Sequence, residues 1–549
     1  MKKWWILGVV LLICTTISFI YFGTSLLEQT GESSLLPSGP GKLTAQEQKD
    51  DQIQDGHKKV IMIIMDSMSA PLVNSAVEKG TMPALKFLMD HGHFYPELVS
   101  PFPTMSVTIE STLLTGKMPD KHHIPGLSWY SPDEGRLINY GTTFLFWMKN
   151  GFRQGIGDTL FNLNNQHLNP AIPTIFEELA KRGKTSGSVN LIVYRGPAQH
   201  RLQLPAWSHK LFGLPDTIET KGPHALAFGR FNRPVTIQGS LPDGLTQRLG
   251  LNDEYSARVV SHVIEQGEQP DFLLAFFPDF DNIAHRHGPH YRKGLEKTDR
   301  FLQEILNSYD SWEQALEKNI FIVLGDHGQD QLVEDKEQAG INLETIYADY
   351  NFHRLGEQTM GSDIAFGVNG RMSYVYAIET KDSLAHLASQ ALEDERVAFA
   401  AWLEGEWGVA QAPGSKQTLR FKPIGPLTDI YGGRWTIHGD EQILGLKLDQ
   451  NKWQIAFTDF PDILNHLYTA LKASASSTVV LTAKPGYSFK AEGISVHAGG
   501  GEHGGAHKHD VLAAMVVAGT DKRPEHSRIV DLKAFVLSLF ELDDKNGRG

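Results

Sequence analysis

The sequence predicts an α/β protein built on a doubly wound, mostly parallel sheet that is flanked by helices. Short apolar runs recur along the chain, at residues 58–65, 271–277, 319–324 and 511–518. Runs of this length suit strands that are buried on both faces of a parallel sheet. Amphipathic segments predict helices between them, at residues 173–182, 295–306 and 530–540. This alternation of strand and helix is typical of a doubly wound sheet.

Each predicted element has a recognisable end. The first apolar run, KKVIMIIM, stops at Asp66, and the run at 319–324 stops at Gly325. The predicted helix at 173–182 ends before Gly183 with basic residues in its last turn, as helix C-termini prefer. Residues 340–500 break the rhythm with turns and short Trp-containing runs, so they predict a smaller inserted or cap region.

Composition excludes several classes of protein. The chain has 549 residues, enough for one large domain with insertions or for two domains. Hydrophobic residues make up 41% and charged residues 21%, which exclude wholesale disorder, a collagen-like fibre and a polytopic membrane protein. The net charge of −13 argues against bulk binding of nucleic acid. Cys14 is the only cysteine, which excludes a disulfide framework, a zinc–thiolate site and a cysteine nucleophile from the rest of the chain.

The N-terminal residues 1–23 predict a membrane anchor or signal. Lys2 and Lys3 precede an apolar run over residues 4–23, which is long enough to cross a bilayer as a helix. The positive flank predicts a single-pass protein of the cell membrane with its ectodomain outside. A cleaved signal peptide, which would make the protein secreted, is the alternative. Residues 24–57, rich in Ser, Gly, Gln and acidic residues, predict a flexible linker, and the folded part spans residues 58–549.

Acidic residues and histidines gather near the predicted strand ends, where open α/β sheets place their ligands. These residues are Asp66, Asp281, His285, Asp326 and His327, and His503 lies in a glycine-dense run near the C-terminus. Each alone has an ordinary structural explanation, such as a helix cap, an ion pair or a solvated loop. Together, three Asp and three His without sulfur suit two Zn²⁺ ions, or a site with Mn²⁺ or another divalent ion. Two metals roughly 3.5–4 Å apart can hold the attacking and leaving oxygens of a phosphoryl displacement.

A hydroxyl nucleophile is available in residues 103–108, PTMSVT, which precede a helix-like segment and Thr115-Gly116. A hydroxyl at a helix N-terminus gains from the helix dipole and the free N–H groups, which also attract phosphate oxygens. An ordinary Ser/Thr helix cap is the structural alternative.

Five motifs follow one another along the chain: VIMIIMDSM, PTMSVTIESTLLTGKMPDKHHIPG, PDFDNIAHRHGP, VLGDHG and GGGEHGG. In order and spacing they resemble the alkaline phosphatase superfamily, and most closely its type I phosphodiesterase/nucleotide pyrophosphatase family. The resemblance implies an alkaline-phosphatase-like catalytic domain with a two-metal site. One metal would be bound by Asp281, His285 and His503. The other would be bound by Asp66, Asp326 and His327, together with the oxygen of the nucleophile.

The resemblance also implies the nucleophile. Its position lies ten residues before Gly116, which is Ser106, although relatives usually carry Thr there. Thr104 and Thr108 are the alternatives. Metal coordination would lower the pKa of the hydroxyl, and the alkoxide would attack phosphorus to give a phosphoseryl enzyme that water then releases.

The sequence departs from nucleotide pyrophosphatases at one position. These enzymes resemble each other in a Thr-Phe-Pro-Asn stretch whose Asn helps to bind a phosphate oxygen, and the matching residue here is Ile109, which cannot donate a hydrogen bond. Stabilisation of the transition state must then come from backbone N–H groups, the metals or another side chain. Glu110 is expected to be a solvated helix acid, or else to orient a cationic substrate group or a ligand histidine.

The expected function is therefore metal-dependent hydrolysis of phosphoric esters at the outer side of a membrane, with diesters favoured over monoesters. The substrate is expected to be a nucleotide, a lipid head group or an envelope polymer. Phosphomonoesterase and head-group phosphotransferase activity are alternatives, as is a non-catalytic envelope-binding module on the same fold. A sulfatase would need Pro and Arg after its converted Cys or Ser, and residues 106–110 hold neither. The sequence does not predict an oligomeric state.

Overall fold

The computed structural model describes residues 58–541, except 142–145, 147, 150, 235–236, 238–239, 358–359 and 475–476. The predicted anchor at 1–23 and the linker at 24–57 lie outside the described residues. None of the helices within the described ranges is both long and apolar enough to span a bilayer.

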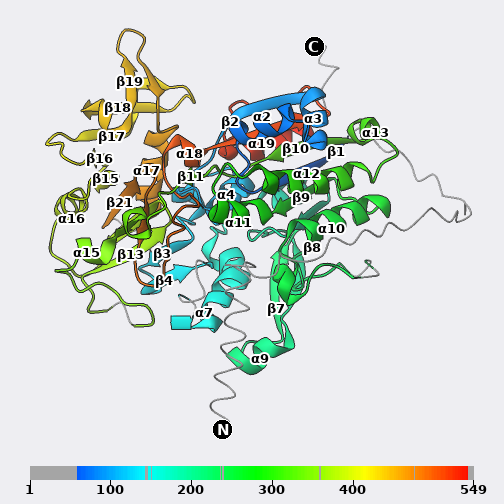
Figure 1. Ribbon diagram of the computed structural model, residues 1–549, viewed down its shortest axis with the longest axis horizontal. Coiled ribbons are helices and arrows are strands. Elements are labelled where there is room, and N and C mark those ends of the chain that lie inside the picture. The colour runs from blue at the N-terminus through cyan, green and yellow to red at the C-terminus, as the bar shows by residue number, and fades with distance from the viewer. Residues whose placement is uncertain are drawn as a thin grey trace, which may run out of the picture.

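A seven-stranded mixed sheet forms the centre of the molecule and confirms the predicted α/β class (Figure 1). Its strand order is β2 (Gly92–Val99), β24 (Leu512–Ala518), β10 (Asn319–Leu324), β1 (Lys59–Met65), β9 (Phe272–Phe277), β5 (Ser186–Val189) and β8 (Ala225–Ala227). The five strands from β10 to β8 are parallel to one another. Strand β24 is antiparallel to both of its neighbours, β10 and β2. An apolar run shows that a strand is buried on both faces, but it carries no information about strand direction.

Helices cover both faces of this sheet, as the doubly wound pattern predicts. In β1, Ile61, Ile63 and Met65 point to one hydrophobic core, while the alternate residues of the strand point to the other. The first core is closed by α2 (Ala70–Glu78), α3 (Pro83–Asp90), α10 (Asp253–Glu265), α12 (Arg292–Leu306) and α13 (Trp312–Lys318). The second is closed by α4 (Ser106–Thr115), α8 (Ile175–Lys181) and α19 (Ile529–Leu539). Helix α8 begins with a capping box between Thr174 and Glu177.

A second, nine-stranded sheet lies beside the first and is drawn at the left of Figure 1. Its strands fall within residues 340–500, where the sequence predicts an inserted region. They are β13 (Ile364–Asn369), β14 (Met372–Ala377), β15 (Val397–Glu404), β16 (Trp407–Gln411), β17 (Leu419–Asp429), β18 (Arg434–Gly439), β19 (Leu446–Asp449), β20 (Gln454–Phe457) and β21 (Thr478–Ala483). Helices α16 (Leu384–Ala391) and α17 (Ile463–Ala473) pack on its two faces.

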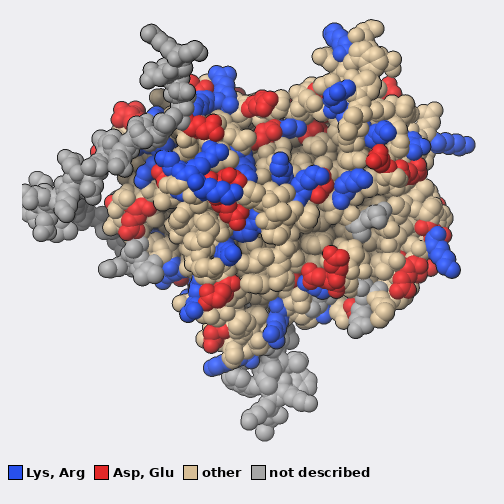
Figure 2. Space-filling model, turned by 180° about the vertical axis from the view of Figure 1, so that it is seen from behind, with Lys and Arg blue, Asp and Glu red and all other residues tan. Residues whose placement is uncertain are grey.

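The remaining elements are short and surround the two sheets. Those before β9 are α5 (Pro119–His122), β3 (Ser128–Ser131), β4 (Arg136–Asn139), α7 (Phe152–Gly157), the π-helix η1 (Asp158–His167), β6 (Ala198–Gln203), α9 (Ala206–Phe212), β7 (Thr217–Gly222) and the 3₁₀ helix η2 (Leu245–Gly250). Those after it are α11 (Asp279–His287), β11 (Asp330–Gln331), α14 (Lys336–Ala339), β12 (Gly340–Asn342), α15 (Leu343–Ile346), η3 (Glu441–Leu444), β22 (Ser488–Lys490), β23 (Gly501–Glu502) and α18 (Lys508–Val511). Acidic and basic side chains are interspersed over the face shown in Figure 2.

Candidate metal centre

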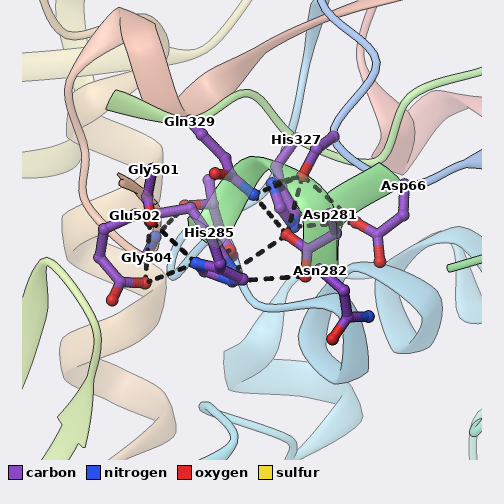
Figure 3. A network of polar contacts seen from close by, with 12 residues as sticks. Asp66, Asp281, Asn282, His285, His327, Gln329, Gly501, Glu502 and Gly504 are labelled. Atoms are coloured by element: carbon purple, nitrogen blue, oxygen red, sulfur yellow. Dashed lines mark hydrogen bonds and ion pairs between the residues drawn. The ribbon is translucent and has the colours of Figure 1, made fainter. Parts of the chain in front are cut away.

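The carboxyl ends of three adjacent strands, β10, β1 and β9, bring most of the predicted site residues together (Figure 3). Asp66 follows β1 directly, and Asp326 follows β10 after one glycine. Helix α11 begins two residues after β9, and it carries Asp281 and His285 one turn apart, on the same helix face. His503 follows β23 and reaches the same cluster. The structure thus brings together all six residues that the sequence predicts as metal ligands.

Asp66, Asp326 and His327 form the more buried half of the cluster. Each offers a ligand atom, and the three atoms all lie within 4.8 Å of one another. His327 Nε2 lies 3.4 Å from Asp66 Oδ1 and 3.7 Å from Asp326 Oδ2. Within the described chain, Asp326 Oδ2 and His327 Nε2 are buried without a hydrogen-bond partner. Buried polar atoms are normally satisfied, so a divalent cation between these atoms would fit the donor set.

Asp281, His285 and His503 form the other half. His285 Nε2 lies 3.3 Å from Asp281 Oδ2, and His503 Nε2 lies 3.7 Å from Asp281 Oδ1. The groups of converging ligand atoms overlap, because His503 also joins His327 and Asp281 in one group and His285 and Glu502 in another. The rings of His327 and His503 stack with their centroids 3.8 Å apart. The two halves are therefore one continuous cluster.

All three histidines are oriented in the same way. The Nδ1 atoms of His285, His327 and His503 lie 2.8, 2.9 and 2.6 Å from the carbonyl oxygens of Gly501, Gly328 and Thr104, respectively. A carbonyl oxygen only accepts hydrogen bonds, so each Nδ1 carries the proton and donates it. In the neutral imidazole, which is the form that binds a metal, each Nε2 then has a lone pair facing the carboxylates. This is the arrangement in which a histidine that binds metal is usually held.

The titration of the cluster reflects its crowding. Burial, together with the neighbouring carboxylates, raises the pKa of Asp66 well above its ordinary value. Burial opposes ionisation of Asp281, but His285 and the other histidines hold its pKa well below its ordinary value. Although burial opposes it, Asp281 raises the pKa of His285 to about 10. Burial and the neighbouring His327 lower the pKa of His503 to about 4, so this imidazole is neutral at physiological pH and able to bind a metal.

Ser106 is the first residue of α4 and is half-buried. The turn before it is fixed to the His503 loop, because the Thr104 carbonyl accepts the hydrogen bond from His503 and the Thr104 hydroxyl accepts one from the Gly504 N–H at 2.8 Å. Ser106 thus lies two residues from a direct contact with the cluster. The alternative nucleophiles are both fully buried: Thr104 is engaged in this contact, and Thr108 lies inside α4.

The sequence interpretation missed three polar residues of the cluster. The hydroxyl of Ser67 donates to Asp281 Oδ1 at 2.9 Å and accepts from the amide of Gln329 at 2.9 Å. The amide of Gln329 also donates to Asp281. Glu502 lies 3.9 Å from His285 Nδ1. Each of them is a sequence neighbour, or near neighbour, of a predicted ligand, and this adjacency is the signal that could have found them.

Two other expectations have clear outcomes. Ile109 is 1% exposed and packs in the hydrophobic core, so its side chain is structural. The expectation that Glu110 is a solvated helix acid is wrong, because its side chain is fully buried and accepts a hydrogen bond from the Val193 N–H at 2.7 Å. Burial raises the pKa of Glu110 to about 8. One turn after Ser106, the helix faces the protein interior.

Comparison with known proteins identifies a family. The model of the family described as type I phosphodiesterase / nucleotide pyrophosphatase matches residues 60–506. A comparison with curated proteins finds no match. Among solved structures, murine and human ectonucleotide pyrophosphatase/phosphodiesterase 5 are similar at 11% and 12% identity, with a TM-score of 0.49 for each. These matches cover 88% of this chain and 95% and 94% of the murine and human chains.

Proposed function

The chain belongs to the type I phosphodiesterase/nucleotide pyrophosphatase family, and from this premise we propose that it is a metal-dependent phosphodiesterase with Ser106 as its nucleophile. Membership of the family supports hydrolysis of phosphoesters. The observation that carries the finer proposal is the convergence of three histidine Nε2 atoms with three carboxylates at one edge of the sheet.

The donor set suits two divalent cations. We assign Asp66, Asp326 and His327 to one cation, and Asp281, His285 and His503 to the other. Imidazole and carboxylate ligands without sulfur favour Zn²⁺, with Mn²⁺ as the next choice. When bound, such cations supply Lewis-acid activation and lower the pKa of an oxygen nucleophile.

In this proposal the hydrolysis takes place in two successive steps. The Oγ atom of Ser106 attacks phosphorus, the ester P–O bond breaks, and the alcohol leaves with a proton. Water next attacks the phosphoserine and releases the phosphoryl group, which restores the serine. Ser106 begins the ten-residue helix α4, whose free N–H groups and dipole favour negative charge at that end. Because Ile109 lies in the core, these N–H groups take over part of the role that an Asn has in nucleotide pyrophosphatases.

The proposal also places the protein at the outer side of the cell membrane. Residues 1–23 would anchor the protein in the cell membrane with the catalytic domain outside. The substrate would be a phosphodiester available there, such as a nucleotide, a lipid head group or an envelope polymer.

The test compares bis-p-nitrophenyl phosphate with p-nitrophenyl phosphate on the full-length chain, before and after chelation, with metal content measured on the same sample. We expect about two metals per chain and chelator-sensitive cleavage of the diester. Faster cleavage of the monoester would identify a phosphomonoesterase. Metal without cleavage of either ester would point to a phosphotransferase. Neither metal nor cleavage after reconstitution with Zn²⁺ and Mn²⁺ would refute the proposal and leave a non-catalytic binding module.

A further inference from the structure

An apolar cavity of about 240 Å³ lies beside the candidate metal centre. It is formed largely by the segment between α7 and η2, which occupies the lower part of Figure 1. Its walls are aromatic and aliphatic, with contributions from Phe152, Ile156, Trp207, Phe212, Phe228 and Phe231. Several of these residues belong to a small hydrophobic cluster that is separate from the cores of the two sheets.

Two of the residues that line the cavity neighbour residues of the candidate site. Asn282 lines it and directly follows Asp281 in α11; Figure 3 shows the Asn282 side chain beside Asp281, directed away from the histidines. Ile192 also lines it, and the next residue in the chain donates its N–H to Glu110, one turn after Ser106 in α4. A substrate held at the metal centre is therefore adjacent to the cavity.

The polar residues that line the cavity are already occupied by the protein. The amide of Asn190 makes three hydrogen bonds, with the Gly250 carbonyl, the Ser256 hydroxyl and the Gly229 N–H. The hydroxyls of Thr159 and Ser208 donate to carbonyls of their own segments at 2.9 and 2.7 Å. The amide of Asn282 donates to the Pro278 carbonyl at 3.1 Å, and Arg248 forms an ion pair with Asp279. A nucleobase has polar edges that need partners, and this cavity offers few.

Two residues near the end of η2 that line the cavity have an unfavourable backbone conformation. Arg248 and Leu249 line the cavity and have φ angles of 51° and 55°, in the left-handed region that non-glycine residues rarely adopt. The Leu249 carbonyl accepts a hydrogen bond from the Arg230 N–H at 2.7 Å, which helps to hold this conformation. Strained backbone of this kind clusters at functional sites.

We propose that this cavity binds a single alkyl or acyl chain of a phosphodiester substrate whose phosphate lies at the metal centre. The inference rests on the proposed function and narrows its substrate class to amphiphilic phosphodiesters. The volume is below the roughly 300–1,000 Å³ of pockets for drug-sized ligands, which suits one chain rather than two. Each methylene that enters such a cavity favours binding about three- to fourfold.

The test uses alkyl p-nitrophenyl phosphates with ethyl, butyl, hexyl, octyl and decyl groups, below their micellar concentrations, on the full-length chain in lipid nanodiscs. We expect kcat/KM to rise about three- to fourfold per methylene and to level off when the cavity is full. Ile156→Trp fills the cavity and should flatten this series while leaving cleavage of the ethyl diester unchanged. Arg153→Trp, on the exposed side of the same helix α7, is the matched control and should keep the full dependence on chain length. Thr159→Phe gives a second filled cavity if Ile156→Trp does not fold.

The outcomes separate this proposal from the proposed function. Cleavage of the ethyl diester without a gain from longer chains would overturn the chain-binding site and leave the phosphodiesterase standing. A gain that survives in both cavity-filling variants would also overturn it. If no diester is cleaved, the chain-binding site is tested by calorimetric titration with decyl methyl phosphate and ethyl methyl phosphate. Tighter binding of the decyl compound, lost in Ile156→Trp but not in Arg153→Trp, supports the site, and equal binding of the two compounds refutes it. Adding vesicles that carry the decyl substrate distinguishes a chain taken from a membrane from one taken from solution.

Discussion

Replacement of Arg371 by Met tests how the second sheet supports the candidate metal centre. Arg371 is fully buried immediately before β14. Its Nη1 atom lies 2.8 Å from Asp510 and 3.2 Å from Asp330, and its backbone N–H donates to the carbonyl of His503 at 2.8 Å. The guanidinium thus links the second sheet to segments next to the cluster.

The expected loss of stability follows from these contacts. Removing one partner of a buried ion pair costs about 3–5 kcal/mol, because the remaining charges lose their compensation. Unfolding entropy is about 2.1 cal/mol/K per residue, so roughly 480 residues unfolding together give about 1 kcal/mol/K. The expected decrease in the melting temperature is therefore about 3–5 °C for Arg371→Met. Replacement of the exposed Arg300 on α12 by Met should change it by less than about 1 °C.

The loss of stability caused by Arg371→Met should depend on pH. Burial raises the pKa of Asp510 to about 7 even with Arg371 beside it, and loss of the cation raises it further. At pH 6 the carboxyl group of the variant is protonated, which relieves the uncompensated charge, so the loss of stability is smaller than at pH 8. Adding Asp510→Asn to Arg371→Met should recover part of the loss at pH 8. Scanning calorimetry at both pH values measures the stability of each variant relative to the wild type. An equal loss of stability at pH 6 and pH 8, with no recovery in the double variant, would refute the reasoning.

Three further predictions concern the nucleophile, the metal and the buried histidines. Ser106→Ala should lower turnover of bis-p-nitrophenyl phosphate by about 10⁴-fold or more while metal content, measured by emission spectrometry, stays near that of the wild type; unchanged turnover would place the nucleophile elsewhere. Asp326→Ala should lose both turnover and bound metal, and a variant with full metal content and normal turnover would exclude Asp326 as a ligand. His122 and His466 are fully buried, and burial lowers the pKa of each to about 3. Because the unfolded chain takes up these protons below about pH 6.5, each histidine should cost about 2 kcal/mol of stability between pH 7 and pH 5. In His466→Leu, the free energy of unfolding lost between pH 7 and pH 5, measured by urea unfolding, should be smaller by about that amount. An unchanged loss would contradict the lowered pKa of His466.

The elements that the sequence predicted well are those in which one local signal is sufficient. The apolar runs at β1, β9 and β10 needed only a continuous apolar stretch with a polar stop, and their ends placed Asp66, Asp281 and Asp326 at one edge of the sheet. The direction of β24 was not predictable in this way. Its antiparallel pairing depends on the path of the chain through the second sheet and back, and no local pattern encodes that path.

Burial of polar residues was the harder part of the site to predict. Glu110 looks like a surface residue in a helix, and its burial depends on the Val193 N–H, which lies 83 positions away along the chain. Ser67 lies within the first motif and Gln329 directly follows the fourth, but neither residue type signals a role there, yet both donate to Asp281. Such residues satisfy hydrogen bonds that only the assembled fold creates. The sequence could therefore predict the acidic residues and histidines that converge at the candidate metal centre, but not the polar residues that hydrogen-bond to them.

The orientation of His503 connects the candidate metal centre to the backbone beside Ser106. Each of the three histidine Nδ1 atoms donates to a backbone carbonyl, so no substitution of a partner side chain can release the ring. For His503 the partner is Thr104, two residues before Ser106, and the Thr104 hydroxyl in turn accepts from the N–H of Gly504. The segment just before α4 and the His503 loop are thus joined by these two hydrogen bonds, and the Thr104 hydroxyl also donates to the Gly505 carbonyl at 3.4 Å. A cation bound at His503 would therefore fix the position of Ser106 through the backbone, since a displacement of either segment breaks these hydrogen bonds.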